Sequence, residues 1–433
     1  MDVEDLEDKK IFFIGIKGTG MSGLALLFKA RGAYVSGSDT EEVFRTDRLL
    51  ANAYIEVKRF DPMNIEPDIN FVVYSSAYNS SHPERAKAKE MEIREFSYGE
   101  ALAKYASRKK TIVISGTHGK TTTTALIGVI FESGGLDPAV LAGDIIINWD
   151  NSVRSGAGDF FIVEGDEYQG KLKMFKPVAV VIPSLDWDHP DYFKTEEDYV
   201  TFFKDFLKEN PQAVLITRNK IAKKLGREAI NYEETDEEIF NRSDFILPGE
   251  AYKSDALLAI RSARKFGIEP HKIVLGLNKF RGVGRRLEQF SRPDDPFFII
   301  YDYAHHPAEI KATLDALAEK YAQHDIVAIF QPHTYSRTRT FMEDFAISFN
   351  MARAVFFDEI CASAREGSNV ADLLGELTAL TKRHHNNVYR LKDLSQAAFL
   401  RIVAKYPKPL LIFMGAGDIW KKAESLSRSL FGK

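Results

Sequence analysis

The chain has 433 residues, of which 45% are hydrophobic and 28% charged, and its formal net charge is −4. This length is too great for one hydrophobic core and predicts two or three domains, while the slight negative charge gives no reason to expect nucleic acid as a partner. The lone Cys361 excludes an intramolecular disulfide framework, and the acidic N-terminus and the lack of a long apolar run predict a cytoplasmic protein without a membrane segment.

A glycine-rich loop follows the first expected strand, residues 10–15. The segment Gly18-Thr-Gly20-Met-Ser-Gly23 matches the Gly-x-Gly-x-x-Gly pattern, and Asp39 ends the next strand about 20 residues further on. Any diphosphate, including that of a UDP-sugar, can bind at a helix N-terminus above such glycines. The motif therefore predicts a Rossmann-like phosphate site and leaves an NAD-dependent oxidoreductase open as an alternative.

A second glycine turn lies between an apolar, β-branched strand pattern at 111–115 and a buried helix pattern at 125–131. This strand-loop-helix context predicts that the turn binds ATP, although its Gly-x-x-Gly-Lys-Thr spacing is shorter than the general phosphate-loop pattern. We expect Lys120 to neutralise the β- and γ-phosphates and the Thr121 hydroxyl to meet Mg²⁺. The expected nucleotide-binding residues are Gly116, Thr117, His118, Gly119, Lys120, Thr121 and Thr122.

Polar residues follow the next two expected strands, 160–163 and 178–183. Several carboxylates in the run Glu164-Gly-Asp-Glu167 are costly without a compensating cation, and Mg²⁺ suits their oxygen ligands. We expect Glu164 to be the first ligand and Asp188 and His189 to converge on the same sheet edge, with a turn-capping role as the alternative. The acidic run 233–238 predicts only a solvated surface.

The third block begins after the Pro/Asp-rich segment 291–296 and alternates strands with helices, the strands being expected at 297–301, 326–330, 354–357 and 409–413. Alternation of this kind predicts an α/β protein with a parallel sheet in every block. We place the N-terminal domain at residues 1–107, the central domain at 108–293 and the C-terminal domain at 294–433. Asp302-Tyr-Ala-His-His-Pro307 follows a strand and suits either substrate orientation or loop packing, and Arg285 and Arg286 suit either a phosphate or an exposed surface.

Taken together in this order, the motifs resemble the Mur ligase family of peptidoglycan synthesis, and most closely its alanine-adding branch. The resemblance spans nearly the whole chain and rests on the two glycine loops, Ser75-Ser-Ala77, the Glu164 and His189 motifs, Arg281-Gly-Val-Gly-Arg-Arg286, Asp302 to Pro307, Gln331 to Thr338 and Gly415 to Asp418. It implies an N-terminal Rossmann-like domain, a central phosphate-loop ATPase sheet and a C-terminal Rossmann-like domain.

The resemblance also implies the chemistry. ATP and Mg²⁺ would drive the joining of L-alanine to UDP-N-acetylmuramate through an acyl phosphate, in a monomer or homodimer. It assigns catalytic roles to Lys120, Glu164, His189, Arg286, Asp302, His333 and Arg337, and metal binding to Thr121, Glu164 and His189. It assigns UDP-sugar binding to Gly15, Gly18, Thr19, Gly20, Met21, Ser22, Asp39, Ser75 and Ser76.

Several positions depart from the family pattern. Ala251 to Asp255 stand where the branch usually has His-Asn-x-x-Asn beside the adenine, Ser184 and Tyr301 replace an Asn and an Asp, and the stretch between Leu215 and Leu247 is short. Two alternatives therefore stay open, a sibling ligase that attaches a tripeptide to the same sugar and a UDP-sugar-binding relative without catalysis. We interpret Lys204 as a surface lysine and not as a modified one.

Overall fold

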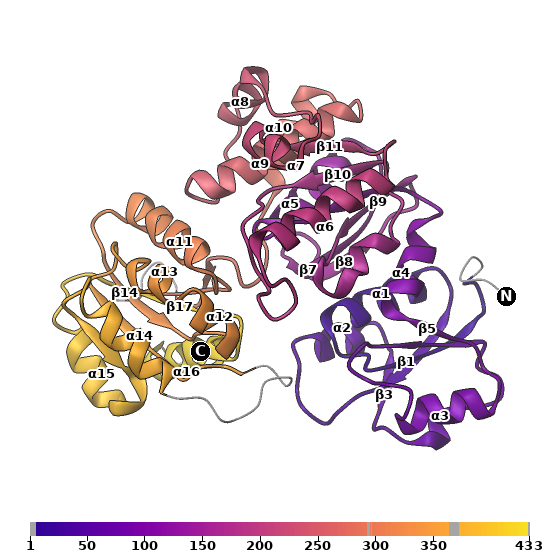
Figure 1. Ribbon diagram of the computed structural model, residues 1–433, viewed down its shortest axis with the longest axis horizontal. Helices are drawn as coiled ribbons and strands as arrows, with labels where there is room; N and C mark the ends of the chain where they lie inside the picture. The colour runs from indigo at the N-terminus through magenta and orange to yellow at the C-terminus, as the bar shows by residue number, and fades with distance from the viewer. Residues whose placement is uncertain (1–5, 292–294, 296, 363–371, 432–433) are drawn as a thin grey trace. The chain divides into compact units, whose positions relative to one another are not determined.

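The computed structural model describes residues 6–291, 295, 297–362 and 372–431, and it contains three α/β sheets that follow one another along the chain (Figure 1). Each sheet is wholly or mainly parallel, as the alternation of strand and helix patterns predicts. Every strand that the sequence predicts is present. Among the described residues, no helix is both long and apolar enough to span a bilayer.

The first sheet has the order β3-β2-β1-β4-β5, and all its neighbouring strands are parallel. Its strands are β1 (Lys10–Ile14), β2 (Tyr34–Ser38), β3 (Glu56–Lys58), β4 (Phe71–Tyr74) and β5 (Glu95–Ser97). Its helices are α1 (Thr19–Ala30), α2 (Thr46–Asn52), η1 (Pro62–Asn64), α3 (Pro83–Glu90) and α4 (Tyr98–Ala106). The central strand β1 is flanked on both sides, so its apolar run is buried and the glycine loop emerges at the carboxyl edge of the sheet.

The central sheet has the order β11-β10-β6-β9-β7-β8, and only β8 runs antiparallel to its neighbour. Its strands are β6 (Lys110–Ile114), β7 (Ala139–Ile146), β8 (Asn151–Ser155), β9 (Phe160–Glu164), β10 (Ala179–Ile182) and β11 (Val214–Thr217). Its helices are α5 (Lys120–Ser133), η2 (Tyr168–Met174), α6 (Glu196–Glu209), α7 (Asn219–Leu225), α8 (Glu234–Asn241), α9 (Glu250–Lys265) and α10 (Pro270–Lys279). Strand β6 lies between β9 and β10, which brings the ends of these three strands to one edge.

The acidic run 233–238 is exposed as predicted except at one residue, where the prediction is wrong. Asp236 is fully buried and accepts a hydrogen bond from Arg264 Nη1 at 2.6 Å. Arg261 lies on the other carboxylate oxygen at 3.5 Å, so two arginines compensate the buried charge between α8 and α9. The arginines lie on a different helix, 25 residues or more further along the chain. The acidic run alone therefore could not predict that Asp236 is buried.

The third sheet has the order β12-β13-β17-β14-β15-β16, with β12 antiparallel and the rest parallel. Its strands are β12 (Glu288–Gln289), β13 (Phe298–Asp302), β14 (Asp325–Phe330), β15 (Ala354–Phe357), β16 (Val388–Arg390) and β17 (Pro409–Met414). Its helices are α11 (Pro307–Lys320), α12 (Tyr335–Thr340), α13 (Met342–Ile347), α14 (Leu373–Thr381), η3 (Leu391–Asp393), α15 (Gln396–Val403) and α16 (Ile419–Phe431). Successive residues of its strands pack into two separate apolar clusters, one on each face.

The internal contacts divide the chain into two compact units. The first unit holds the first two sheets and comprises Met1–Asp186, Val200–Ile246 and Asp255–Gly282. The second unit holds the third sheet and comprises Trp187–Tyr199, Leu247–Ser254 and Val283–Lys433. The three-domain boundaries at 107 and 293 stay predictions, and the second of them falls at residues 292–294, outside the described part of the chain, as do Pro293, Asp294 and Pro296 of the expected break.

Candidate active site

The phosphate loop occupies the turn between β6 and α5, where the sequence predicts it. Gly116 (φ 125°) and Gly119 (φ 80°) adopt backbone conformations that other residues rarely reach, and Gly119 caps α5. Lys120 folds back over the turn, and its Nζ donates to the carbonyl of Gly116 at 2.5 Å and to that of Thr117 at 3.2 Å. The turn thus presents an ammonium group and the N-terminus of a helix together, which favours an anionic ligand.

The loop that follows β10 braces this turn. Ser184 Oγ accepts from His118 N at 2.6 Å, and Asp186 N donates to Thr117 Oγ1 at 2.9 Å. The Thr117 hydroxyl donates in turn to the carbonyl of Asp186. Ser184 is one of the departures from the family pattern, and its hydroxyl still forms a hydrogen bond to the phosphate loop.

Two carboxylates of the Glu164 to Glu167 run face the start of α5. Glu164 ends β9, and its Oε1 accepts from Thr121 Oγ1 at 3.1 Å while its Oε2 accepts from Gly143 N at 2.7 Å. Glu167 is fully buried, and its carboxylate lies 3.4 Å from Lys120 Nζ. The buried carboxylate is therefore compensated by the lysine of the phosphate loop.

Thr121 and Glu164 fit Mg²⁺, because a hydroxyl and a carboxylate oxygen point to one place beside the phosphate loop. Within the described residues, no group of three His, Cys, Asp or Glu side chains forms a ready-made metal site. Mg²⁺ commonly takes one or two protein ligands and completes its shell with water and phosphate oxygens, so this donor set is adequate. The third predicted ligand, His189, belongs to the second unit and stays a prediction.

A cavity of about 530 Å³ joins the two glycine motifs within the first unit. The predicted UDP-sugar residues that line it are Gly18, Thr19, Gly20, Met21, Ser75 and Ser76, and Lys120 and Glu164 also line it. Sequence reasoning missed its other lining residues, Ser97, Tyr98, Gly99, Leu141, Ala142, Gly143, Gly165, Asp166, Gln169, Lys171 and Met174. Most of these lie on β7, α4 and η2, which carry no recognisable motif, although Asp166 belongs to a run that the sequence does single out.

Three of the predicted UDP-sugar residues lie behind this lining. The Asp39 carboxylate accepts from Lys17 N and from Thr40 N, both at 2.7 Å, and so holds the glycine loop to the end of β2. Ser22 is buried in α1, and its hydroxyl donates to the carbonyl of Thr19 at 3.0 Å. Gly15 lies under the ring of Tyr78. In this structure these residues shape the loop, and direct sugar contacts by them stay predictions.

The altered segment Ala251 to Asp255 forms the first turns of α9. Asp255 lies in the first unit with its carboxylate against the phosphate loop, since a β-carbon added to Gly119 would come within 2.5 Å of Asp255 Oδ1. The position that departs from the family pattern therefore still adjoins the nucleotide loop.

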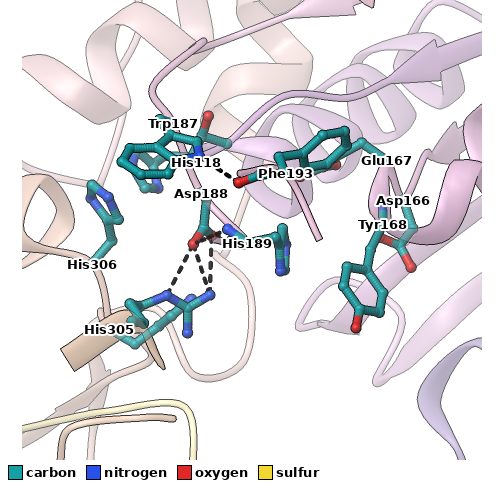
Figure 2. Close-up of polar contacts among 12 residues, drawn as sticks. His118, Asp166, Glu167, Tyr168, Trp187, Asp188, His189, Phe193, His305 and His306 are labelled. Carbon is teal, nitrogen blue, oxygen red and sulfur yellow. Dashed lines mark hydrogen bonds and ion pairs between the residues drawn. The ribbon is translucent and has the colours of Figure 1, made fainter. Parts of the chain in front are cut away.

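In the second unit, Asp188 and Arg337 form a buried ion pair, each about 5% exposed. Arg337 Nε donates to Asp188 Oδ1 at 3.0 Å and Nη2 donates to Oδ2 at 3.1 Å. Figure 2 shows dashed lines that end at the Asp188 carboxylate. Burial alone would raise the pKa of Asp188, but the guanidinium and the neighbouring histidines hold it well below its usual range. The Asp188 carboxylate also accepts from His189 N at 2.7 Å and thereby orients that residue, whose φ is 54°.

Arg286 and Asp302 lie close together beneath a strained turn of the second unit. The residues on either side of Arg286, Arg285 and Leu287, both have positive φ, and Asp302 stabilises the turn by accepting from Leu287 N at 2.8 Å. Burial would lower the pKa of Arg286, but Glu309 and Asp302 raise it, so the guanidinium stays charged. Burial raises the pKa of Asp302 despite the arginine. Both predicted residues thus occupy one buried, charged cluster.

Other residues of the second unit that the sequence singles out contact one another or neighbouring motifs. His333 Nδ1 lies 3.3 Å from Arg337 Nη1, so these two predicted residues are adjacent. Gln331 Nε2 donates to Asp418 Oδ1 at 2.9 Å, which joins two of the later sequence motifs. Tyr301, another departure from the family, is buried and donates its hydroxyl to the carbonyl of Gly415 at 3.1 Å.

Three family descriptions match the chain in succession. Residues 10–110 match "Mur ligase family, catalytic domain", residues 114–247 match "Mur ligase middle domain" and residues 285–417 match "Mur ligase, glutamate ligase domain". The UDP-N-acetylmuramate--L-alanine ligase of Desulfitobacterium hafniense is 34% identical over 96% of this chain and 99% of its own. The ligase of the same name from Pediococcus pentosaceus is 33% identical over 98% and 99%.

Solved structures of similar proteins share the fold. A UDP-N-acetylmuramate-alanine ligase from Thermotoga maritima superposes with a TM-score of 0.78 at 23% identity, over 98% of this chain and all of that one. A murein peptide ligase from Psychrobacter arcticus superposes with a TM-score of 0.68 at 20% identity, over 98% and 99% of the two chains.

The buried Asp188–Arg337 pair leads to a prediction for stability. Arg337→Ala leaves an uncompensated buried carboxylate and should lower the free energy of unfolding of the second unit by about 3 kcal/mol, measured by urea unfolding with tryptophan fluorescence. Arg353→Ala is the control, because Arg353 is exposed and pairs with Asp325 at 3.4 Å, a contact expected to contribute less than about 1 kcal/mol. Equal losses in the two variants would contradict the assigned importance of the buried pair.

A second prediction concerns pH. Burial lowers the pKa of His305 to about 3, so in the folded protein this histidine is neutral where an unfolded one, with a pKa of about 6.5, becomes protonated. The unfolded chain binds more protons between these two values, so stability falls as pH drops through this window. From pH 7 to pH 5 the loss should be about 2 kcal/mol. His305→Gln should remove that part of the slope in urea unfolding, and an unchanged slope would refute the assignment.

Proposed function

The chain belongs to the Mur ligase family, and from this premise we propose that it joins L-alanine to UDP-N-acetylmuramate at the expense of ATP. The observation that carries the proposal is the single cavity lined both by the glycine loop at the start of α1 and by Lys120 and Glu164 of the central sheet. A substrate whose sugar carries a diphosphate at one position and a carboxylate arm at another suits a cavity with those two walls. We further propose that the enzyme works in the cytoplasm, where its nucleotide substrates are found.

The geometry suggests how each end of the sugar substrate is held. Main-chain N–H groups at the start of α1 suit the diphosphate, and the small side chains of Ser75 and Ser76 leave room beside them. The apolar side chains of Met21, Leu141 and Met174 suit the methyl groups of the sugar. Burial, with smaller contributions from Asp166 and Glu164, raises the pKa of Tyr98, so its phenol stays neutral and can donate a hydrogen bond.

At the other end, the carboxylate of the sugar acid would lie next to the phosphate loop. One of its oxygens attacks the γ-phosphorus of ATP with release of ADP, and the amino group of L-alanine then displaces phosphate to form the amide. Lys120 and the start of α5 neutralise phosphate charge, and this electrostatic help is the main need of phosphoryl transfer. Mg²⁺ bound at Thr121 and Glu164 would add positive charge there.

The remaining predicted groups lie in the second unit. We propose that Arg286, which stays charged in its buried cluster, binds the nucleotide, and that Asp302 positions it by holding the turn on which it lies. We propose that His189 completes the metal site and that His333 contacts the amine or the acyl phosphate. Arg337 donates hydrogen bonds from two of its nitrogens to Asp188, so we propose that it orients the Asp188-His189 turn. We also keep the predicted contact of Arg337 with the amino acid or the acyl phosphate.

The alternatives differ in what they leave unexplained. A tripeptide ligase shares the fold, but three relatives that are 34%, 33% and 30% identical over 96–98% of this chain carry the alanine-ligase name. An NAD-dependent oxidoreductase gives no role to Lys120, although this residue lines the same cavity as the glycine loop. A relative without catalysis would have no need of the braced phosphate loop.

Selectivity for the amine tests the proposal. Phosphate release from Mg-ATP should require both UDP-N-acetylmuramate and L-alanine, and mass spectrometry should find the amide product. Release that depends on the L-Ala-γ-D-Glu-meso-diaminopimelate tripeptide would select the sibling activity. Sugar binding without release for any amine would mean that the chain binds but does not ligate.

The phosphate loop is tested by a pair of lysine variants. Lys120→Ala removes the ammonium group that lies over the turn and should lower ATP turnover by about 10²- to 10³-fold, as removal of a group that stabilises transition-state charge does. Lys204→Ala is the control, because Lys204 is exposed on α6, and it should turn over like the wild type. Retained phosphate release in the Lys120 variant would refute the assignment.

A further inference from the structure

Lys171 is a second lysine on the wall of the cavity that contains Lys120, and the chemistry above gives it no role. Its Nζ lies 2.7 Å from Asp166 Oδ2, and its side chain is 25% exposed. It comes from η2, a short segment that neither glycine motif includes. The cavity therefore has two ammonium groups, one on the phosphate loop and one on η2.

The backbone of η2 is built to present this side chain. Gln169 (φ 57°) and Gly170 (φ 74°) both adopt left-handed conformations, and Gln169 does so without being a glycine, which is a cost that functional segments often carry. The segment is held at both ends, because Tyr168 N donates to Asp166 Oδ1 at 3.0 Å and Met174 packs against Gly99. Leu172 is fully buried, so its neighbours Lys171 and Lys173 leave the segment in other directions.

Each lysine of the cavity is paired with one carboxylate of the same run. Lys120 lies against Glu167, which is fully buried, whereas Lys171 lies against Asp166, whose side chain is 49% exposed. A part-exposed pair of this kind is worth little, so an anionic ligand can share or replace Asp166 at small cost. Lys171 is thus the more readily recruited of the two ammonium groups.

Lys171 could meet either the diphosphate or the carboxylate of the ligand, and the elements that line the cavity decide between them. This inference rests on the proposed function. The diphosphate finds its donors on α1 of the first sheet, whereas the carboxylate must reach the phosphate loop of the central sheet. Lys171 lies seven residues beyond Glu164, on the central-sheet part of the lining that also includes Lys120. A lysine ammonium is a compact charge on a flexible stem and suits a single carboxylate.

We propose that Lys171 binds the carboxylate of the UDP-sugar acid and selects for sugars that carry one. The ammonium leaves Asp166 in part when the acid arm enters, and it holds that arm beside Lys120 and Thr121 for attack on ATP. Lys171 is a specificity-determining residue and takes no part in bond making.

Calorimetric titration of the full chain without ATP tests this directly. The ligands are UDP-N-acetylmuramate and UDP-N-acetylglucosamine, which share the diphosphate and differ by the acid arm. Lys171→Ala should raise the Kd of the acid about tenfold, which corresponds to about 1.4 kcal/mol, and should leave the Kd of the neutral sugar unchanged. Lys171→Arg, which keeps the charge, should recover most of the lost affinity.

Two further variants separate binding from structure. Lys173→Ala is the matched control, because Lys173 is on the same segment but lies over the ring of Phe202 at 5.4 Å and does not line the cavity. It should bind both sugars like the wild type. Asp166→Asn keeps the bond to Tyr168 N through its amide oxygen and removes the competing charge, so it should bind the acid as tightly as the wild type or more tightly.

Three titration results would contradict the proposed role of Lys171, and each has its own interpretation. Equal weakening of both sugars by Lys171→Ala would place the lysine at the diphosphate, and equal weakening by Lys171→Ala and Asp166→Asn would show that their pair is structural. No change in either Kd would make Lys171 a solvated side chain. All three overturn the proposal. Because the titrations need no turnover, they stay decisive even if the chain fails to ligate L-alanine, and failure of the wild type to bind either sugar would instead refute the proposed function.

Discussion

The position of β6 between β9 and β10 is the constraint on which the site of the first unit depends. Parallel strands end at the same edge, so the phosphate loop, Glu164 and the Ser184 loop meet there without any long connection. The turn from Gly116 to Gly119 can then be braced from the β10 side by Ser184, while Glu164 on the β9 side meets Thr121. The strand order thus brings the phosphate loop and the Glu164 carboxylate, which we propose for anion and metal binding, to one edge of the sheet.

Several buried carboxylates of the protein are compensated by a lysine or an arginine. Glu167 is buried against Lys120, Asp236 against two arginines, Asp188 against Arg337 and Asp302 near Arg286. Loss of one partner of such a pair costs more than the pair contributes, because the other charge stays buried. The Lys171–Asp166 pair differs by being part-exposed, and this is why it suits a ligand that comes and goes.

Much of the fold follows from sequence because each buried parallel strand is an apolar run that ends in polar residues, as at 111–115 and 160–164. The phosphate loop, Glu164 and the glycine loop were predictable for the same reason. The hairpin of β7 and β8, the kinked η2 and the role of Lys171 were not, because they depend on contacts between distant elements and on a left-handed Gln169 that no local pattern signals. The burial of Asp236 needed arginines from another helix.

If one cavity brings the sugar carboxylate to the phosphate loop, an oxygen atom of that carboxylate must pass to the phosphate that is released. UDP-N-acetylmuramate labelled with ¹⁸O in its carboxylate would be converted with unlabelled ATP and L-alanine, and the released phosphate analysed by mass spectrometry. Attack of the carboxylate on the γ-phosphorus predicts phosphate that carries one ¹⁸O atom. Unlabelled phosphate, released with or without amide, would exclude attack of the carboxylate on ATP.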